Sequence, residues 1–96
     1  MNIKVSNKAV AWYKEELALS ADACIRFFVR YGGHSSIQSG FSLGISKDHP
    51  VHPIVSIEQD GLTFFIEESD LWFFDGHDLI IQFNEKLGEP EFLYEK

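Results

Sequence analysis

The sequence predicts a small α+β domain that is rich in sheet, with one N-terminal helix and one short second helix. Three observations support this class. Only one stretch has the spacing of an amphipathic helix, about six short segments alternate as strands do, and Asp60-Gly61 stands between two such segments as a hairpin turn. Because few crossover helices exist, we expect antiparallel or mixed strands in a distorted sandwich. The length of 96 residues suits a single domain over residues 1–96.

The N-terminal part predicts a short edge strand at Asn2–Val5, followed by a helix over Asn7–Leu19. Ser6 is a favourable N-cap residue for that helix. An apolar stripe at helical spacing predicts the buried face of the helix, and it consists of Val10, Tyr13 and Leu17.

The segments Ala23–Tyr31 and Gln38–Ser46 alternate in polarity and predict neighbouring strands. In the first segment, one face is apolar and the other carries Arg26, Phe28 and Arg30. A polar loop at Lys47–Pro53 is expected to follow, because prolines restrict its backbone.

The C-terminal half predicts more strands and the short helix. We expect a hairpin around Asp60-Gly61, a short helix or turn over Glu67–Phe74 and strands at Leu79–Phe83 and Glu91–Tyr94. Leu71 and Trp72 are expected to be buried.

Composition limits the classes of partner. The net charge is −7, from 15 acidic and 8 basic residues, and a nucleic-acid backbone would be repelled by such a chain. The single cysteine, Cys24, cannot form an internal disulfide, which together with the absence of a signal peptide predicts a cytoplasmic protein. The apolar runs are too short to cross a bilayer, so we expect no membrane partner; a homodimer is possible.

The order of motifs resembles the HesB-like, A-type iron–sulfur carrier family. The resemblance rests on the strand Ile25–Arg30, the turn Gly33-His34-Ser35-Ser36, the strand at Phe41-Ser42-Leu43 and the run from Phe65-Ile66-Glu67 through Asp75-Gly76 to Leu79-Ile80-Ile81. It implies the fold of that family over most of the chain.

The same resemblance implies a cluster site that this sequence does not complete. Members of the family use a cysteine where His34 stands and a Cys-Gly-Cys near the C-terminus, whereas this chain ends in Phe92-Leu93-Tyr94-Glu95-Lys96. Cys24 matches no ligand position. Since cluster iron is held chiefly by thiolates, we expect no bound cofactor.

Two functions of different classes remain open. The first is a non-enzymatic protein-interaction or regulatory module that has lost its cluster, with Gly33, His34, Ser35, Arg26, Phe28 and Arg30 as candidate contact residues. The alternative is an iron-binding or iron–sulfur biogenesis accessory protein that uses His34 in place of the cysteine. Arg26 and Arg30 could equally pair with carboxylates inside the domain. No convincing catalytic set is present, so we expect no enzyme activity.

Overall fold

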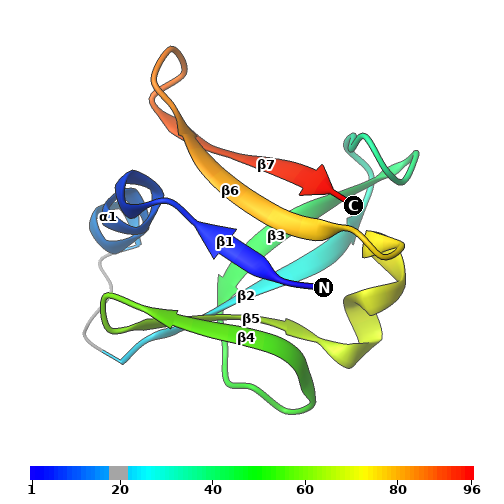
Figure 1. Ribbon diagram of the computed structural model, residues 1–96, viewed down its shortest axis with the longest axis horizontal. Helices are drawn as coiled ribbons and strands as arrows, with labels where there is room; N and C mark the ends of the chain where they lie inside the picture. The colour runs from blue at the N-terminus through cyan, green and yellow to red at the C-terminus, as the bar shows by residue number, and fades with distance from the viewer. Residues whose placement is uncertain (18–21) are drawn as a thin grey trace.

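The computed structural model describes residues 1–17 and 22–96. These residues form one α-helix, one 3-10 helix and seven strands (Figure 1). In chain order the elements are β1 (Ile3–Val5), α1 (Asn7–Glu16), β2 (Cys24–Tyr31), β3 (Phe41–Lys47), β4 (Pro53–Gln59), β5 (Leu62–Glu67), η1 (Glu68–Phe74), β6 (Asp78–Asn84) and β7 (Glu89–Glu95). The predicted α+β class is therefore confirmed.

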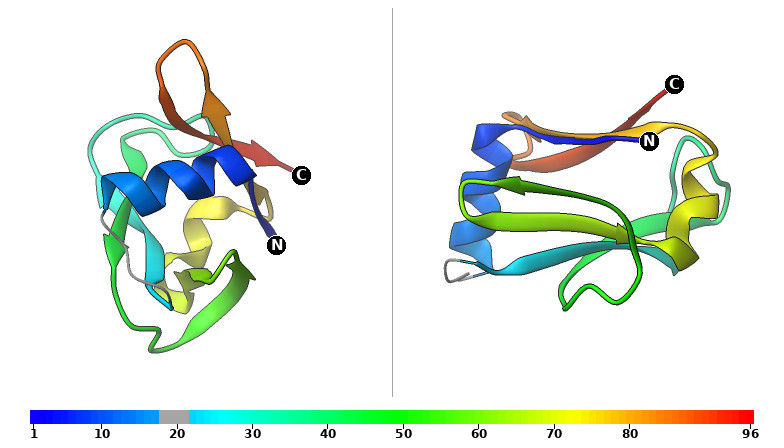
Figure 2. Two further views of the ribbon diagram at one scale, coloured as in Figure 1. Left: turned by 90° about the vertical axis from the view of Figure 1, so that its left-hand side faces the viewer. Right: turned by 60° about the horizontal axis from the view of Figure 1, so that its bottom comes forward.

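The strands form two mixed sheets. One has the order β1-β6-β7 and the other β3-β2-β5-β4. β1 pairs in parallel with β6, and β2 with β5, while the remaining pairs are antiparallel. Figure 2 shows the two sheets as layers, with α1 at one end of the space between them and η1 at the other.

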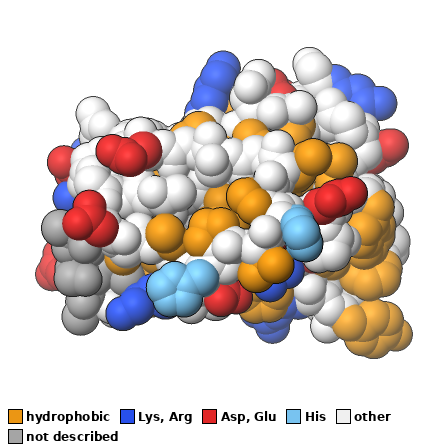
Figure 3. Space-filling view, turned by 90° about the horizontal axis from the view of Figure 1, so that it is seen from below, with side chains coloured by type: hydrophobic (Ala, Val, Ile, Leu, Met, Phe, Trp, Pro, Cys, Tyr) orange, Lys and Arg blue, Asp and Glu red, His pale blue; other side chains and the backbone are white. Residues whose placement is uncertain are grey.

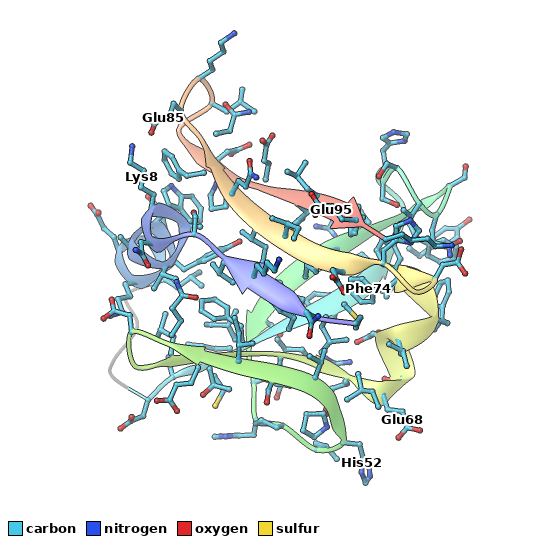
Figure 4. All side chains as sticks on the ribbon, viewed as in Figure 1. Lys8, His52, Glu68, Phe74, Glu85 and Glu95 are labelled. Carbon is cyan, nitrogen blue, oxygen red and sulfur yellow. The ribbon has the colours of Figure 1, made fainter. Side chains whose placement is uncertain are left out.

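α1 begins where the sequence predicts. The Ser6 hydroxyl accepts a hydrogen bond from the Ala9 amide at 3.2 Å, and Val10 and Tyr13 are buried. The helix ends at Glu16, earlier than predicted, and the predicted end at Leu19 lies outside the described residues. Among the helices described, none is long and apolar enough to cross a membrane. An exposed ion pair joins Lys8 of α1 to Glu85 in the turn between β6 and β7 (Figure 4).

The core lies between the sheets and is built on aromatic rings. Phe27 of β2 stacks on Phe64 of β5 with ring centroids 5.8 Å apart, and Phe92 of β7 meets Phe27 edge-on at 5.9 Å. Tyr13 brings α1 against Phe64 at 6.0 Å. The predicted apolar face of β2 is therefore the face that closes the core.

The prediction that Leu71 and Trp72 are buried is wrong, since their exposed fractions are 37% and 52%. The reason is that η1 is a 3-10 helix, which is wound more tightly than an α-helix. In a 3-10 helix residues three apart lie on the same side, so Asp70 and Phe73 both turn inward. Phe74 is also buried and lies 6.3 Å from the ring of Tyr94.

β3 also begins later than predicted, at Phe41 instead of Gln38. The Phe41 amide donates to the Gln38 carbonyl at 3.3 Å, so residues 38–40 form a turn. β7 spans more residues than expected and includes Pro90, which is tolerated because β7 is an edge strand.

Phe27→Ala should lower the free energy of unfolding by about 3–5 kcal/mol, because it empties a fully buried site that three elements share. Leu87→Ala is the control, since Leu87 is 67% exposed and its loss should change stability by less than about 0.5 kcal/mol. Urea unfolding followed by tryptophan fluorescence measures both. Equal midpoints for the two variants would show that the packing between the sheets is not the main source of stability.

Candidate functional site

The loop between β2 and β3 contains the predicted site turn. It is closed by a hydrogen bond from the Gly32 amide to the Gly40 carbonyl at 2.7 Å. Gly33 has φ +73°, and a Cβ placed there would lie 2.6 Å from the Ser42 hydroxyl oxygen. Both the backbone angle and this close approach therefore require glycine at position 33.

Hydrogen bonds fix the loop on itself and on η1. The Ser35 hydroxyl donates to the Gln38 carbonyl at 2.9 Å and accepts from the Gln38 amide at 3.1 Å. The Gln38 side-chain amide in turn donates to the Phe73 carbonyl at 3.3 Å. Ser35 is therefore a structural residue of the loop, whereas His34 and Ser36 are exposed.

His34 lines a surface groove of about 870 Å³, which we call the His34 groove. Its walls come from the loop, from β2 and β3, and from the end of β7, where Figure 4 labels Glu95. The lining residues are Arg30, Gly33, His34, Ser35, Ser36, Ser42, Leu43, Phe92, Leu93, Tyr94 and Glu95. Burial raises the pKa of Tyr94 to about 12, so this phenol stays protonated at neutral pH.

The donors of the His34 groove do not match those of an iron–sulfur cluster, which is held chiefly by thiolates. The groove offers one imidazole, hydroxyls and the Glu95 carboxylate, and no thiol lines it. Cys24 lies at the opposite end of β2 from the loop, beside Lys47, Asp48 and His49. Among the residues described, no group of three or more His, Cys, Asp or Glu side chains is placed to share a metal ion.

Arg26 is half-buried and forms ion pairs inside the domain. Its guanidinium donates to the Asp70 carboxylate at 2.8 Å and lies 3.7 Å from that of Asp48. The hydrogen bond that Arg26 donates to Asp70 raises the pKa of Arg26. Asp70 also accepts from the Val29 amide at 3.4 Å. The open alternative of internal ion pairing is thus observed for Arg26.

A second carboxylate, on Glu67, fixes the loop before β4. It accepts from the Val51 amide at 2.9 Å and from the His52 amide at 3.0 Å. The Glu68 amide donates back to the His52 carbonyl at 2.9 Å, and Figure 4 shows His52 and Glu68 close together. The sequence interpretation did not assign either Asp70 or Glu67 to these roles. The sequence does contain one signal for the role of Asp70. An arginine in a core strand requires a carboxylate partner.

Phe28 and Arg30 lie on a second groove, of about 470 Å³, that we call the Gly44 groove. Gly44 is the register partner of Phe28, and a Cβ at Gly44 would lie 2.6 Å from Phe28 and 2.7 Å from Arg30. The missing side chain therefore lets both residues lie across β3. The lining residues are Trp12, Tyr13, Phe28, Arg30, Leu43, Gly44, Ile45, Glu89, Pro90 and Phe92.

An aromatic surface lies beside the loop. Tyr31 meets Phe41 edge-on at 5.7 Å, Phe41 meets Trp72 at 5.2 Å, and Tyr31 is 91% exposed. Figure 3 shows hydrophobic side chains gathered at the right-hand edge of the molecule, the side on which Figure 1 places η1. Exposed tyrosine and tryptophan are enriched at protein interfaces.

Asp70→Ala should lower the free energy of unfolding by about 1–3 kcal/mol, because it removes a charge-assisted hydrogen bond and leaves the Arg26 guanidinium without its main partner. Glu68→Ala, at an exposed position on the same short helix, is the matched control and should change stability little. Thermal unfolding measures the two. The assigned role of Asp70 fails if the variants unfold alike.

Comparison with known proteins identifies the family to which this fold belongs. A family model described as iron-sulphur cluster biosynthesis matches residues 1–94. The crystal structure of Escherichia coli SufA, involved in biosynthesis of iron-sulfur clusters, superposes with a TM-score of 0.59 at 18% identity, covering 98% of this chain and 79% of that one. That likeness supports the fold alone.

Sequence relatives cover nearly the whole chain. A Bacillus subtilis protein named pyruvate dehydrogenase inhibitor is 55% identical over 95 residues, which are 99% of this chain and 100% of the relative. An uncharacterized protein of Staphylococcus saprophyticus is 44% identical over 92 residues, 93% of this chain and 94% of its own. With the family model matched from residue 1 to residue 94, the chain belongs to the iron-sulphur cluster biosynthesis family of HesB-like, A-type carrier proteins.

Proposed function

We propose that this chain is a non-enzymatic regulatory protein that inhibits pyruvate dehydrogenase through direct protein contact. The observation that carries the proposal is the 55% identity to the Bacillus subtilis pyruvate dehydrogenase inhibitor along the whole of both chains. Identity at this level over the whole of both chains implies the same fold and supports a related role. The fold by itself assigns no activity, since one fold serves many functions.

The donor chemistry supports a function that does not use a cluster. In the resembled carriers the site needs thiolates, and here the corresponding turn offers His34 between Gly33 and Ser35. Imidazole can replace a thiolate on iron, but the only thiol of the chain is at the far end of β2. We infer that cluster binding has been lost while the scaffold has been retained.

The exposed side chains support contact with a protein. Tyr31, Trp72 and Arg30 belong to the residue types that dominate binding energy at interfaces, and all three are exposed here. Arg30 and Tyr31 end β2 just before the turn where the chain departs from the carriers, and Trp72 packs edge-on against Phe41, which follows the loop. We therefore place the contact at the loop end of the molecule, and leave Arg26 out because it is engaged by Asp70.

The purified chain should lower pyruvate-dependent NADH formation by the Bacillus subtilis pyruvate dehydrogenase complex in proportion to its concentration. His34→Ala should raise the half-inhibitory concentration, because it removes the exposed imidazole of the turn. His49→Ala, an exposed histidine on a different loop, is the matched control. A different NADH-forming dehydrogenase checks the assay itself. Full activity of the complex at saturating chain would refute the proposal.

Anaerobic incubation with iron and sulfide should leave the protein without a stable chromophore after desalting, because no set of thiolates exists to hold a cluster. Absorption spectra and iron analysis of untagged protein provide the measurement. The same samples test iron binding at His34, by comparison with His34→Ala. A stoichiometric charge-transfer band that Cys24→Ser abolishes would contradict the inferred loss.

A further inference from the structure

The free edge of β3 is the feature from which we start. β3 is the terminal strand of its sheet and pairs only with β2. Hydrogen bonds from the Gly32 amide to the Gly40 carbonyl and from the Asp48 amide to the Cys24 carbonyl flank this pairing. Main-chain bonding alternates along antiparallel strands. The even-numbered residues of β3 therefore bond to β2, and the odd-numbered ones direct their amide and carbonyl groups away from it.

Two of these outward-directed residues, Leu43 and Ile45, line the Gly44 groove. Within residues 1–17 and 22–96, the main chain of neither residue has a hydrogen-bond partner outside the β2–β3 pairing. An unpaired edge of this kind is a template for another strand. Strand addition to a sheet edge is a recurring mode of peptide recognition, in which main-chain bonds supply affinity and side-chain pockets supply specificity.

The groove supplies pockets beside that edge. Trp12 of α1 and Phe92 of β7 contribute apolar walls to it. Arg30 lies over Gly44 and forms no ion pair within 4.0 Å with any described carboxylate. Glu89 lines the same groove but does not reach the guanidinium. An incoming carboxylate would therefore find a cation that the domain leaves available.

We propose that an extended segment of a pyruvate dehydrogenase subunit adds to β3 as a further strand, bonding to the main chain of Leu43 and Ile45. The segment carries an apolar side chain against Trp12 and Phe92 and a carboxylate that pairs with Arg30. Gly44 makes this site possible, because any side chain there would displace Arg30. The proposal rests on the proposed function and specifies the surface used.

A second copy of this chain is the less suitable occupant of the same edge. Each copy has a net charge of −7, so pairing two copies along β3 brings like charges together. The edge is also flanked by α1 and β7, which line the groove beside it. A single extended segment fits between those walls more readily than the edge of a folded domain.

Two variants with matched controls test the proposal on the pyruvate dehydrogenase complex. Arg30→Glu reverses the free charge, and its half-inhibitory concentration should rise by about tenfold or more. Lys47→Glu makes the same change of charge on β3 outside the groove and should behave as wild type. Ile45→Pro removes an outward-directed amide without removing a bond to β2, so it should weaken inhibition. Lys47→Pro is its control on the same edge.

Hydrogen–deuterium exchange gives a direct readout of strand addition. The amides of Leu43 and Ile45 should exchange about tenfold or more slowly in the presence of the complex, because they become hydrogen-bonded. Circular dichroism establishes that each variant is folded, and Arg30→Glu keeps the test valid if Ile45→Pro does not fold.

The outcomes separate the two proposals. No inhibition by the wild-type chain would overturn the proposed function, and the choice of partner with it. Normal inhibition by wild type, with unchanged Arg30→Glu and unprotected Leu43 and Ile45, would overturn the strand-addition site alone. A wild-type dimer that Ile45→Pro dissociates, observed by light scattering, would assign the edge to a second copy and also overturn it.

Discussion

The ion pair between Arg26 and Asp70 is the contact on which the arrangement of the site depends. It joins β2 to η1 at 2.8 Å, and the second oxygen of the same carboxylate accepts from the Val29 amide. With η1 fixed, the Phe73 carbonyl is in place to receive the Gln38 side chain, which carries the site loop. A partly buried ion pair of this type adds little to the free energy of unfolding compared with a well-packed apolar pair. Its geometry nevertheless determines where η1 and the loop lie.

That contact also explains the surface that the domain displays. Because Asp70 and Phe73 face inward on a 3-10 helix, Leu71 and Trp72 are left facing outward. Trp72 then packs edge-to-face against Phe41, which in turn packs edge-to-face against Tyr31. The scaffold of a carrier protein is thus retained, while the position of its cluster ligand holds an exposed histidine. Arg30 lines the same groove and forms no ion pair with any described carboxylate. Tyrosine, tryptophan and arginine are enriched at protein interfaces, which supports the proposed protein contact.

Regular periodicity made the fold predictable from the sequence. Contacts between residues far apart in the sequence could not be predicted in the same way. The alternation in β2, the cap at Ser6 and the Asp60-Gly61 hairpin are local signals, and each appears in the structure at the predicted place. The pairing of Arg26 with Asp70 joins residues 44 apart in sequence, and nothing local selects that acid over the other acidic residues. Leu71 and Trp72 were misplaced because composition suggested burial, while the helix type decided their direction. The Gly44 groove depends on a glycine opposite Phe28, and only the strand register reveals it.

The central claim is that this member of the family acts through protein contact and not through iron. Inhibition of the pyruvate dehydrogenase complex, measured with and without a strong iron chelator and followed by metal analysis of the isolated inhibitor–enzyme complex, tests that claim most directly. We expect the same inhibition curve in both conditions and no iron that follows the chain in stoichiometric amount. Inhibition that disappears with the chelator and returns with added iron would contradict the claim.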